Sequence, residues 1–215
     1  MSGRTVSIRS TIFPERGIHV GAGFVLALAA SLLVAPWEVA AAVLLAAALH
    51  EGGHLAALAA FGVPVDGLRL GACGAVIYAP GARRLSYGRE LAVTLAGPLV
   101  NLALAPLLAR LAVRYGWAWL CLFAGAHLVL GVYNLLPIPP LDGARALYLL
   151  AAYRCGPVLG ERICAAAGLC CASALALLGA RVFVTGRGAL LLLSALYLLC
   201  GALRGGRHST YGKNI

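Results

Sequence analysis

The sequence predicts an all-α polytopic membrane protein with six transmembrane helices and a short membrane-associated β-hairpin. Of its 215 residues, 62% are hydrophobic and only 11% are charged, whereas soluble domains typically carry about 25% charged residues. The apolar residues form long continuous runs, and about 20 such residues are enough to cross a hydrocarbon core as a helix. Strands of a transmembrane β-barrel would instead alternate apolar and polar residues, so the continuous runs favour helices.

Six apolar runs account for the predicted helices. The spans are expected at about 18–35, 39–61, 91–108, 117–136, 160–180 and 187–203. Pro36-Trp37-Glu38 separates the first two runs as a tight turn with an interfacial aromatic residue. After the second run the composition becomes more polar, and β-prone pieces on either side of Ala72-Cys73-Gly74 predict a hairpin at about 66–80.

The connection after the fourth run has a different character. Residues 134–143 read Asn-Leu-Leu-Pro-Ile-Pro-Pro-Leu-Asp-Gly, and the three prolines exclude a regular helix there. A short amphipathic piece over 144–153 follows, before the last two runs. The chain is expected to be a single membrane-embedded domain over residues 1–215.

The positive charge indicates topology. The net charge is +10, but the basic residues are scattered over short loops, which does not resemble a nucleic-acid-binding surface. With six spans, thirteen of the seventeen basic residues fall on the side that holds both termini. Cytosolic loops are enriched in Lys and Arg, so the sequence predicts a multi-pass integral membrane protein with cytosolic N- and C-termini.

The second run contains a metal-binding pattern, His50-Glu51-Gly52-Gly53-His54. Histidines four positions apart on a helix lie about 40° apart around the axis and roughly 6 Å apart along it, so both can bind one metal ion. This is the HExxH pattern of zinc peptidases, in which the histidines bind Zn²⁺ and the glutamate is the general base. A structural alternative is hydrogen bonding between helices, but ionisable groups are costly at membrane depth and indicate a functional site.

The predicted topology brings a third acidic or basic group to the same depth. The second span runs towards the cytosol, so His54 lies about six residues, or roughly 9 Å, from its cytosolic end. The fourth span also runs towards the cytosol, and its proline-rich exit places Asp142 in the same leaflet. Asp142 is therefore a candidate third ligand, although an Asp-Gly pair is also a common turn.

These motifs together resemble the site-2 protease family of intramembrane zinc metalloproteases. The resemblance rests on HEGGH, on Gly97-Pro98-Leu99-Val100-Asn101 and on the decapeptide of residues 134–143, and it covers about residues 1–155. Six spans and the opening Gly17-Ile18-His19-Val20 are similar to the stage IV sporulation protein FB type. We expect neither the PDZ domain that some relatives insert nor the C-terminal CBS domain that sporulation-type relatives often carry, so the resemblance does not extend to regulation by ATP or to a role in sporulation.

The resemblance implies a role for each site residue. His50, His54 and Asp142 would bind one Zn²⁺ per chain, and Glu51 would act as the catalytic base. Asn134 would be a second catalytic residue that donates a hydrogen bond to the developing oxyanion or orients the substrate backbone. Polar contact between helices is the alternative for Asn134, and it is favoured for His127 and Asn101.

The predicted function is hydrolysis of a peptide bond in or near a transmembrane or membrane-tethered segment of a substrate protein, close to the cytosolic face. The resemblance implies a pro-sigma factor or a membrane-anchored regulator as substrate, in the cytoplasmic membrane of a bacterium. The hairpin would hold the unwound substrate as an added strand. Two alternatives are a divalent-metal transporter, in which Glu51 would tolerate replacement by Gln, and a catalytically silent membrane-binding module. The ligand set alone also admits Fe²⁺ or Co²⁺.

Overall fold

The structure is a computed structural model that describes residues 17–71, 74–186 and 188–205. The polar N-terminal lead-in and most of the polar C-terminal tail, whose charges enter the topology prediction, lie outside these residues. Three described helices are long and apolar enough to cross a membrane: α2 (Trp37–Ala60), α3 (Tyr87–Tyr115) and α6 (Pro157–Val184). They coincide with three of the predicted spans, and they indicate an integral multi-pass membrane protein.

The other three predicted spans are also helices, but shorter ones. These are α1 (Ala22–Val34), α4 (Ala118–Asn134) and α7 (Ala189–Gly205). With 13 residues, α1 is the shortest of them, and it falls short of the roughly 20 residues that a hydrocarbon core requires. Its predicted start was wrong by about four residues, because residues 17–20 form a strand instead of the first helical turn.

A small three-stranded sheet replaces the predicted two-stranded hairpin. Strands β2 (Gly67–Gly71) and β3 (Gly74–Tyr78) pair antiparallel as expected, and β1 (Gly17–Val20) adds to β2 in parallel, giving the order β1-β2-β3. The Gly21 amide then donates to the Leu70 carbonyl at 2.9 Å, which extends the pairing up to the start of α1. Residues 17–20 therefore satisfy backbone hydrogen bonds by pairing with β2, which follows 50 residues later in the sequence.

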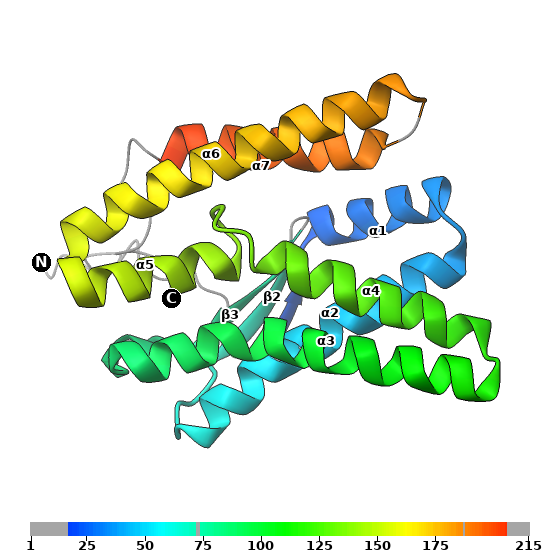
Figure 1. Cartoon of the computed structure of the whole chain (residues 1–215). Helices are drawn as coiled ribbons and strands as arrows, with labels where there is room; N and C mark the ends of the chain where they lie inside the picture. The colour runs from blue at the N-terminus through cyan, green and yellow to red at the C-terminus, as the bar shows by residue number, and fades with distance from the viewer. Residues whose placement is uncertain (1–16, 72–73, 187, 206–215) are drawn as a thin grey trace, which may run out of the picture.

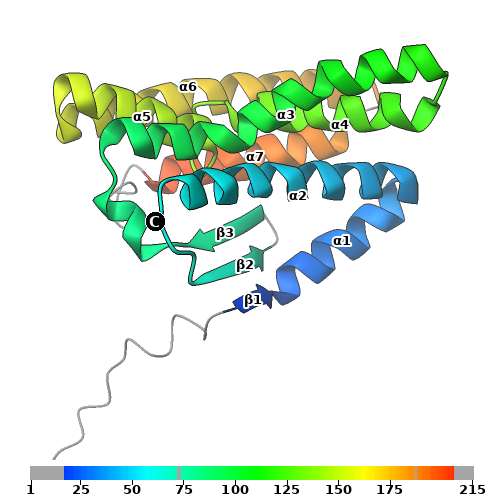
Figure 2. The ribbon, with the colours of Figure 1, turned by 90° about the horizontal axis from the view of Figure 1, so that it is seen from below.

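The helices form a layered bundle (Figure 1). Helix α3 packs against α2 and α4, while α6 and α7 lie side by side. Between these groups lies α5 (Asp142–Cys155), the predicted amphipathic piece, which packs against α3 and α6. The sheet lies along α2, and Figure 2 draws β3 between β2 and that helix.

Small residues allow these helices to approach closely. A Cβ at Gly53 of α2 would lie 2.8 Å from the Ala96 carbonyl oxygen of α3, and one at Gly168 of α6 would lie 2.9 Å from the Pro137 carbonyl oxygen. Helices in lipid associate through such backbone contacts. The proline-rich connection is itself buried, because Ile138 packs against α6 and α7 in one apolar cluster. That packing fixes the loop that leads to α5.

Candidate metal centre

Helix α2 brings two histidines to one buried face. The side chains of His50 and His54 are only 6% and 10% exposed, and their rings meet edge to face with centroids 4.8 Å apart. The Nε2 atoms of the two rings lie 3.2 Å apart. The predicted convergence of two histidines one helical turn apart is therefore present in the structure.

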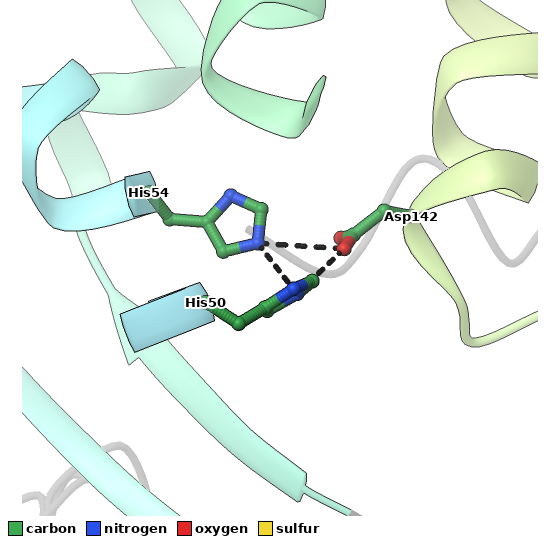
Figure 3. Close-up of side chains that lie close together, drawn as sticks. All are labelled: His50, His54 and Asp142. Atoms are coloured by element: carbon green, nitrogen blue, oxygen red, sulfur yellow. Dashed lines mark hydrogen bonds and ion pairs between the residues drawn. The ribbon is translucent and has the colours of Figure 1, made fainter. Parts of the chain in front are cut away.

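Asp142, the first residue of α5, meets these histidines from another part of the chain (Figure 3). Its Oδ2 lies 3.0 Å from His50 Nε2 and 3.4 Å from His54 Nε2. Gly143 makes this approach possible, since a Cβ there would lie 2.1 Å from the Leu135 carbonyl oxygen. Only a residue without a side chain lets the start of α5 fold back against the end of α4.

The three ligand atoms fit a tetrahedral zinc ion. Zinc binds His nitrogen and carboxylate oxygen at about 2.0–2.2 Å, so neighbouring corners of its tetrahedron lie about 3.4 Å apart. The observed separations of 3.0, 3.2 and 3.4 Å are close to that value. Among the described residues, His50, His54 and Asp142 form the group of three that could hold a metal ion. Two nitrogens and one carboxylate also leave a fourth position for a reactant.

The hydrogen bond of His54 to the backbone leaves its other ring nitrogen available to a metal ion. His54 Nδ1 lies 2.8 Å from the Val93 carbonyl oxygen, which can only accept, so Nδ1 carries the proton and donates it. When His54 is neutral, its Nε2 therefore has a lone pair that can bind a metal ion, and when His54 is protonated on both nitrogens, Nε2 donates to the carboxylate of Asp142. Pro98 lies inside α3, where it has no N–H to donate to the preceding turn of the helix.

Asp142 is in its ligand form in this setting. Burial alone would raise the pKa of Asp142, but hydrogen bonds and charge interactions with His50 and His54 outweigh that effect and hold the pKa below its usual value. A metal ligand must be deprotonated before it binds. The carboxylate therefore needs no proton loss to bind a cation.

Helix α3 closes the site from the other side. Gly97 faces both imidazoles, and a Cβ at this position would lie 2.4 Å from His54 Nε2 and 2.8 Å from His50 Nε2. One turn later, Asn101 lies 3.2 Å from His50 Nδ1 through its amide nitrogen as placed, and its amide oxygen lies 2.9 Å from His127 Nδ1 of α4. The sequence showed Gly97 and Asn101 as part of a motif, but it did not indicate that they contact His50.

The two predicted catalytic residues differ in their surroundings. Glu51 is half-buried beside the three ligands, and its carboxyl interacts electrostatically with His50, His54 and Asp142. Asn134, at the end of α4, donates from Nδ2 to the Leu130 carbonyl oxygen at 3.0 Å, a bond within its own helix. The proposed contact of Asn134 with substrate stays a prediction.

This chain is similar in its fold to a solved structure. No protein-family model matches it, and no curated protein matches it. Among solved structures, the site-2 protease from Methanocaldococcus jannaschii is similar, with a TM-score of 0.65 and 24% sequence identity over 89% of this chain and 91% of that one. This likeness concerns the fold, and the chemistry rests on the residues described above. The chain thus has a site-2 protease fold, and that fold carries a His-His-Asp group suited to a metal ion.

Proposed function

We propose that the chain is a zinc metalloendopeptidase of the site-2 protease type. It hydrolyses a peptide bond in or near a transmembrane or membrane-tethered segment of a substrate protein, close to the cytosolic face. The observation that supports this most strongly is the meeting of His50, His54 and Asp142 beside Glu51 on an apolar helix. Ionisable groups are costly at membrane depth, so their presence in such a helix supports a functional site.

The residues of the chain divide the chemistry between them. His50, His54 and Asp142 would hold the zinc, which supplies a Lewis acid that polarises the peptide carbonyl and makes water more acidic. Glu51 takes the proton from the attacking water and passes it to the leaving amine. The surrounding apolar helices limit the access of other water, which strengthens these charge interactions. Asn134 is proposed to donate to the developing oxyanion once it releases the Leu130 carbonyl.

The sheet supports a way to bind substrate. A helical peptide bond is shielded by its own hydrogen bonds, so a membrane segment must be extended before hydrolysis. Among the described strands, β3 pairs with β2 alone, and Figure 2 draws it on the side of the sheet towards α2. An extended substrate added to the β3 edge would gain backbone hydrogen bonds and lie along the helix that carries Glu51. Membrane-anchored regulators, including pro-sigma factors, are the proposed substrate class.

The proposal is tested with Glu51→Gln, which removes the base and keeps the volume of the side chain. Purified wild type and variant are compared in detergent and in liposomes for bound zinc and for cleavage of membrane-tethered substrates. We expect one zinc per chain in both proteins and at least a thousandfold loss of cleavage in the variant, and mass spectrometry should place the cut near the cytosolic end of the substrate segment. Glu38→Gln, an exposed change at the start of the same helix, is the matched control and should cleave normally.

Two outcomes would contradict the proposal. If Glu51→Gln cleaves as fast as wild type, Glu51 is not the base. If neither protein cleaves any substrate while both carry metal ions across liposomes at equal rates, the site serves metal transport and the protease assignment is wrong.

A further inference from the structure

A buried chain of hydrogen bonds leads from the metal centre into the next two helices. His50 of α2 contacts Asn101 of α3 through Nδ1, and Asn101 contacts His127 of α4 through Nδ1 of that ring. Asn101 and His127 are fully buried, at 0% exposure, and the ring of Phe123 packs edge to face on His127 with centroids 4.5 Å apart. The proposed protease mechanism gives no role to His127.

The two metal-binding histidines differ in how their protons are fixed. For His54 the partner is a backbone carbonyl, so Nδ1 must carry the proton and Nε2 is free for a metal. For His50 the partner is an amide group, whose nitrogen donates and whose oxygen accepts. The two ends of an Asn amide are assigned from their hydrogen bonds, so the state of His50 depends on which end faces it.

Metal binding allows one of the two orientations. If the nitrogen of Asn101 faces His50, it donates to the lone pair of Nδ1, and the His50 proton must sit on Nε2, the atom that faces Asp142. A nitrogen that carries this proton cannot bind a metal ion. If the oxygen faces His50, Nδ1 donates to it and Nε2 keeps its lone pair. Zinc at the site therefore requires the oxygen of Asn101 to accept from His50.

This orientation makes a demand on His127. The amide nitrogen of Asn101 then points to His127 Nδ1, which must accept and cannot carry a proton. A neutral His127 accordingly has its proton on Nε2, a buried atom that has no hydrogen-bond partner among the described residues. In either proton arrangement Nε2 of His127 is a buried polar atom without a partner among the described residues, and such an atom costs free energy. An apolar residue would fill this position at lower cost if packing were its only role.

We propose that Asn101 and His127 are positioning residues that fix the proton of His50 on Nδ1. His127 accepts from the Asn101 amide, Asn101 thereby presents its oxygen to His50, and Nε2 of His50 stays free for zinc. The proposal rests on the zinc site of the proposed function. It adds that residues of α3 and α4 determine which ring nitrogen of His50 carries the proton. Partners of this kind, which orient a metal-binding His, typically change metal affinity by 10- to 100-fold when they are mutated.

The first test compares two changes at Asn101. Zinc affinity of the full-length protein in detergent is measured by competition with a chromophoric chelator. Asn101→Leu, which has no acceptor, should bind zinc about 10- to 100-fold more weakly than wild type. Asn101→Asp has an oxygen at both ends, so it accepts from His50 in either orientation and should stay within a few fold of wild type. If Asn101 served packing only, the buried carboxylate of Asn101→Asp would be at least as harmful as Leu.

The second test concerns His127. His127→Phe removes the acceptor that orients the amide, so we expect weaker zinc binding in the wild-type background and no further effect in Asn101→Leu, where the chain of hydrogen bonds is already broken. Leu120→Ala, at another buried position of α4, is the control: it should lower the thermal stability and leave zinc affinity unchanged. Nitrogen-15 NMR of labelled histidine in the zinc-loaded protein reports the proton positions directly, and we expect Nδ1–H on His50 and Nε2–H on His127.

The outcomes separate the two proposals. If wild type binds no zinc, both the zinc protease and this inference are wrong. If wild type binds zinc but Asn101→Leu binds it equally well, or Asn101→Asp loses as much affinity as Asn101→Leu, the inference alone is overturned. A proton on Nδ1 of His127 in the zinc-loaded protein would overturn it as well.

Discussion

Gly97 lies where helix α3 passes the two imidazoles of α2. A methyl group there would overlap His54 Nε2 at 2.4 Å, and His54 cannot swing aside without giving up its bond to the Val93 carbonyl. We therefore expect Gly97→Ala to weaken zinc binding at least a hundredfold while the helical content measured by circular dichroism stays the same. Gly88→Ala on the same helix, where a Cβ meets nothing within 4 Å, is the control. Unchanged zinc affinity in Gly97→Ala would show that the metal lies elsewhere.

At the same residue scale, the sequence predicted which three residues meet in the His-His-Asp group, but it did not predict the residues that contact this group. His50 and His54 follow from one helical period, and Asp142 follows from topology together with the family resemblance. Asn101 and His127 could not be placed in this way, because their contacts join residues 51 and 26 positions apart on three helices. Which side chains meet across helices depends on helix rotation, and nearly uniform Ala and Leu faces do not specify that rotation.

At the scale of elements, the position of Asp142 depends on how α5 is attached to α3. Arg145, one turn into α5, donates to Glu90 at the start of α3, with Nε to Oε1 at 2.9 Å and a second bond from Nη2 to the same oxygen. Both side chains are mostly shielded, at 20% and 14% exposure. Such charge-assisted pairs are stronger than exposed ion pairs.

We expect this pair to hold α5 in register. In a double-mutant cycle of Glu90→Gln and Arg145→Gln, the coupling free energy for unfolding should be about 1–3 kcal/mol, and each single variant should bind zinc several-fold more weakly than wild type because Asp142 lies three residues from Arg145. The measurements are thermal unfolding and chelator competition. Additive effects on stability, with zinc affinity unchanged, would contradict a role of the pair in placing Asp142.

The elements also show where hydropathy misleads. Helices α2 and α6 were predicted to within four residues of their ends. Helix α3 instead continues seven residues past its predicted end at 108, through Arg110 and Arg114 to Tyr115, because a helix does not stop where its apolar run stops. The start of α1 was misplaced because Ile18 and Val20 are apolar in either a helix or a strand. Their pairing with β2 depends on a segment 50 residues away, and an apolar run carries no information about such a partner.

At the scale of the whole molecule, the candidate metal centre joins parts of the bundle that are otherwise linked through α3. Helix α2 packs against α3 and α4, whereas α5 packs against α3 and α6. A zinc ion held by His50, His54 and Asp142 would tie α2 directly to α5 and close a long loop of chain. Ligands that bind only the folded state stabilise it by mass action, by about 4 kcal/mol at a free concentration a thousand times the Kd.

Removal of zinc should therefore lower the thermal stability of the whole bundle. For a chain of this size, about 4 kcal/mol corresponds to a fall in Tm of roughly 8–16 °C. The measurement is the Tm in detergent with saturating zinc and after dialysis against a chelator. His54→Ala, which cannot complete the site, is the control, and its Tm should be the same in both conditions. Equal Tm values for wild type with and without zinc would mean that the ion does not link α2 to α5. If removal of zinc lowers the Tm of wild type but not that of His54→Ala, the residues from these two helices act as one site.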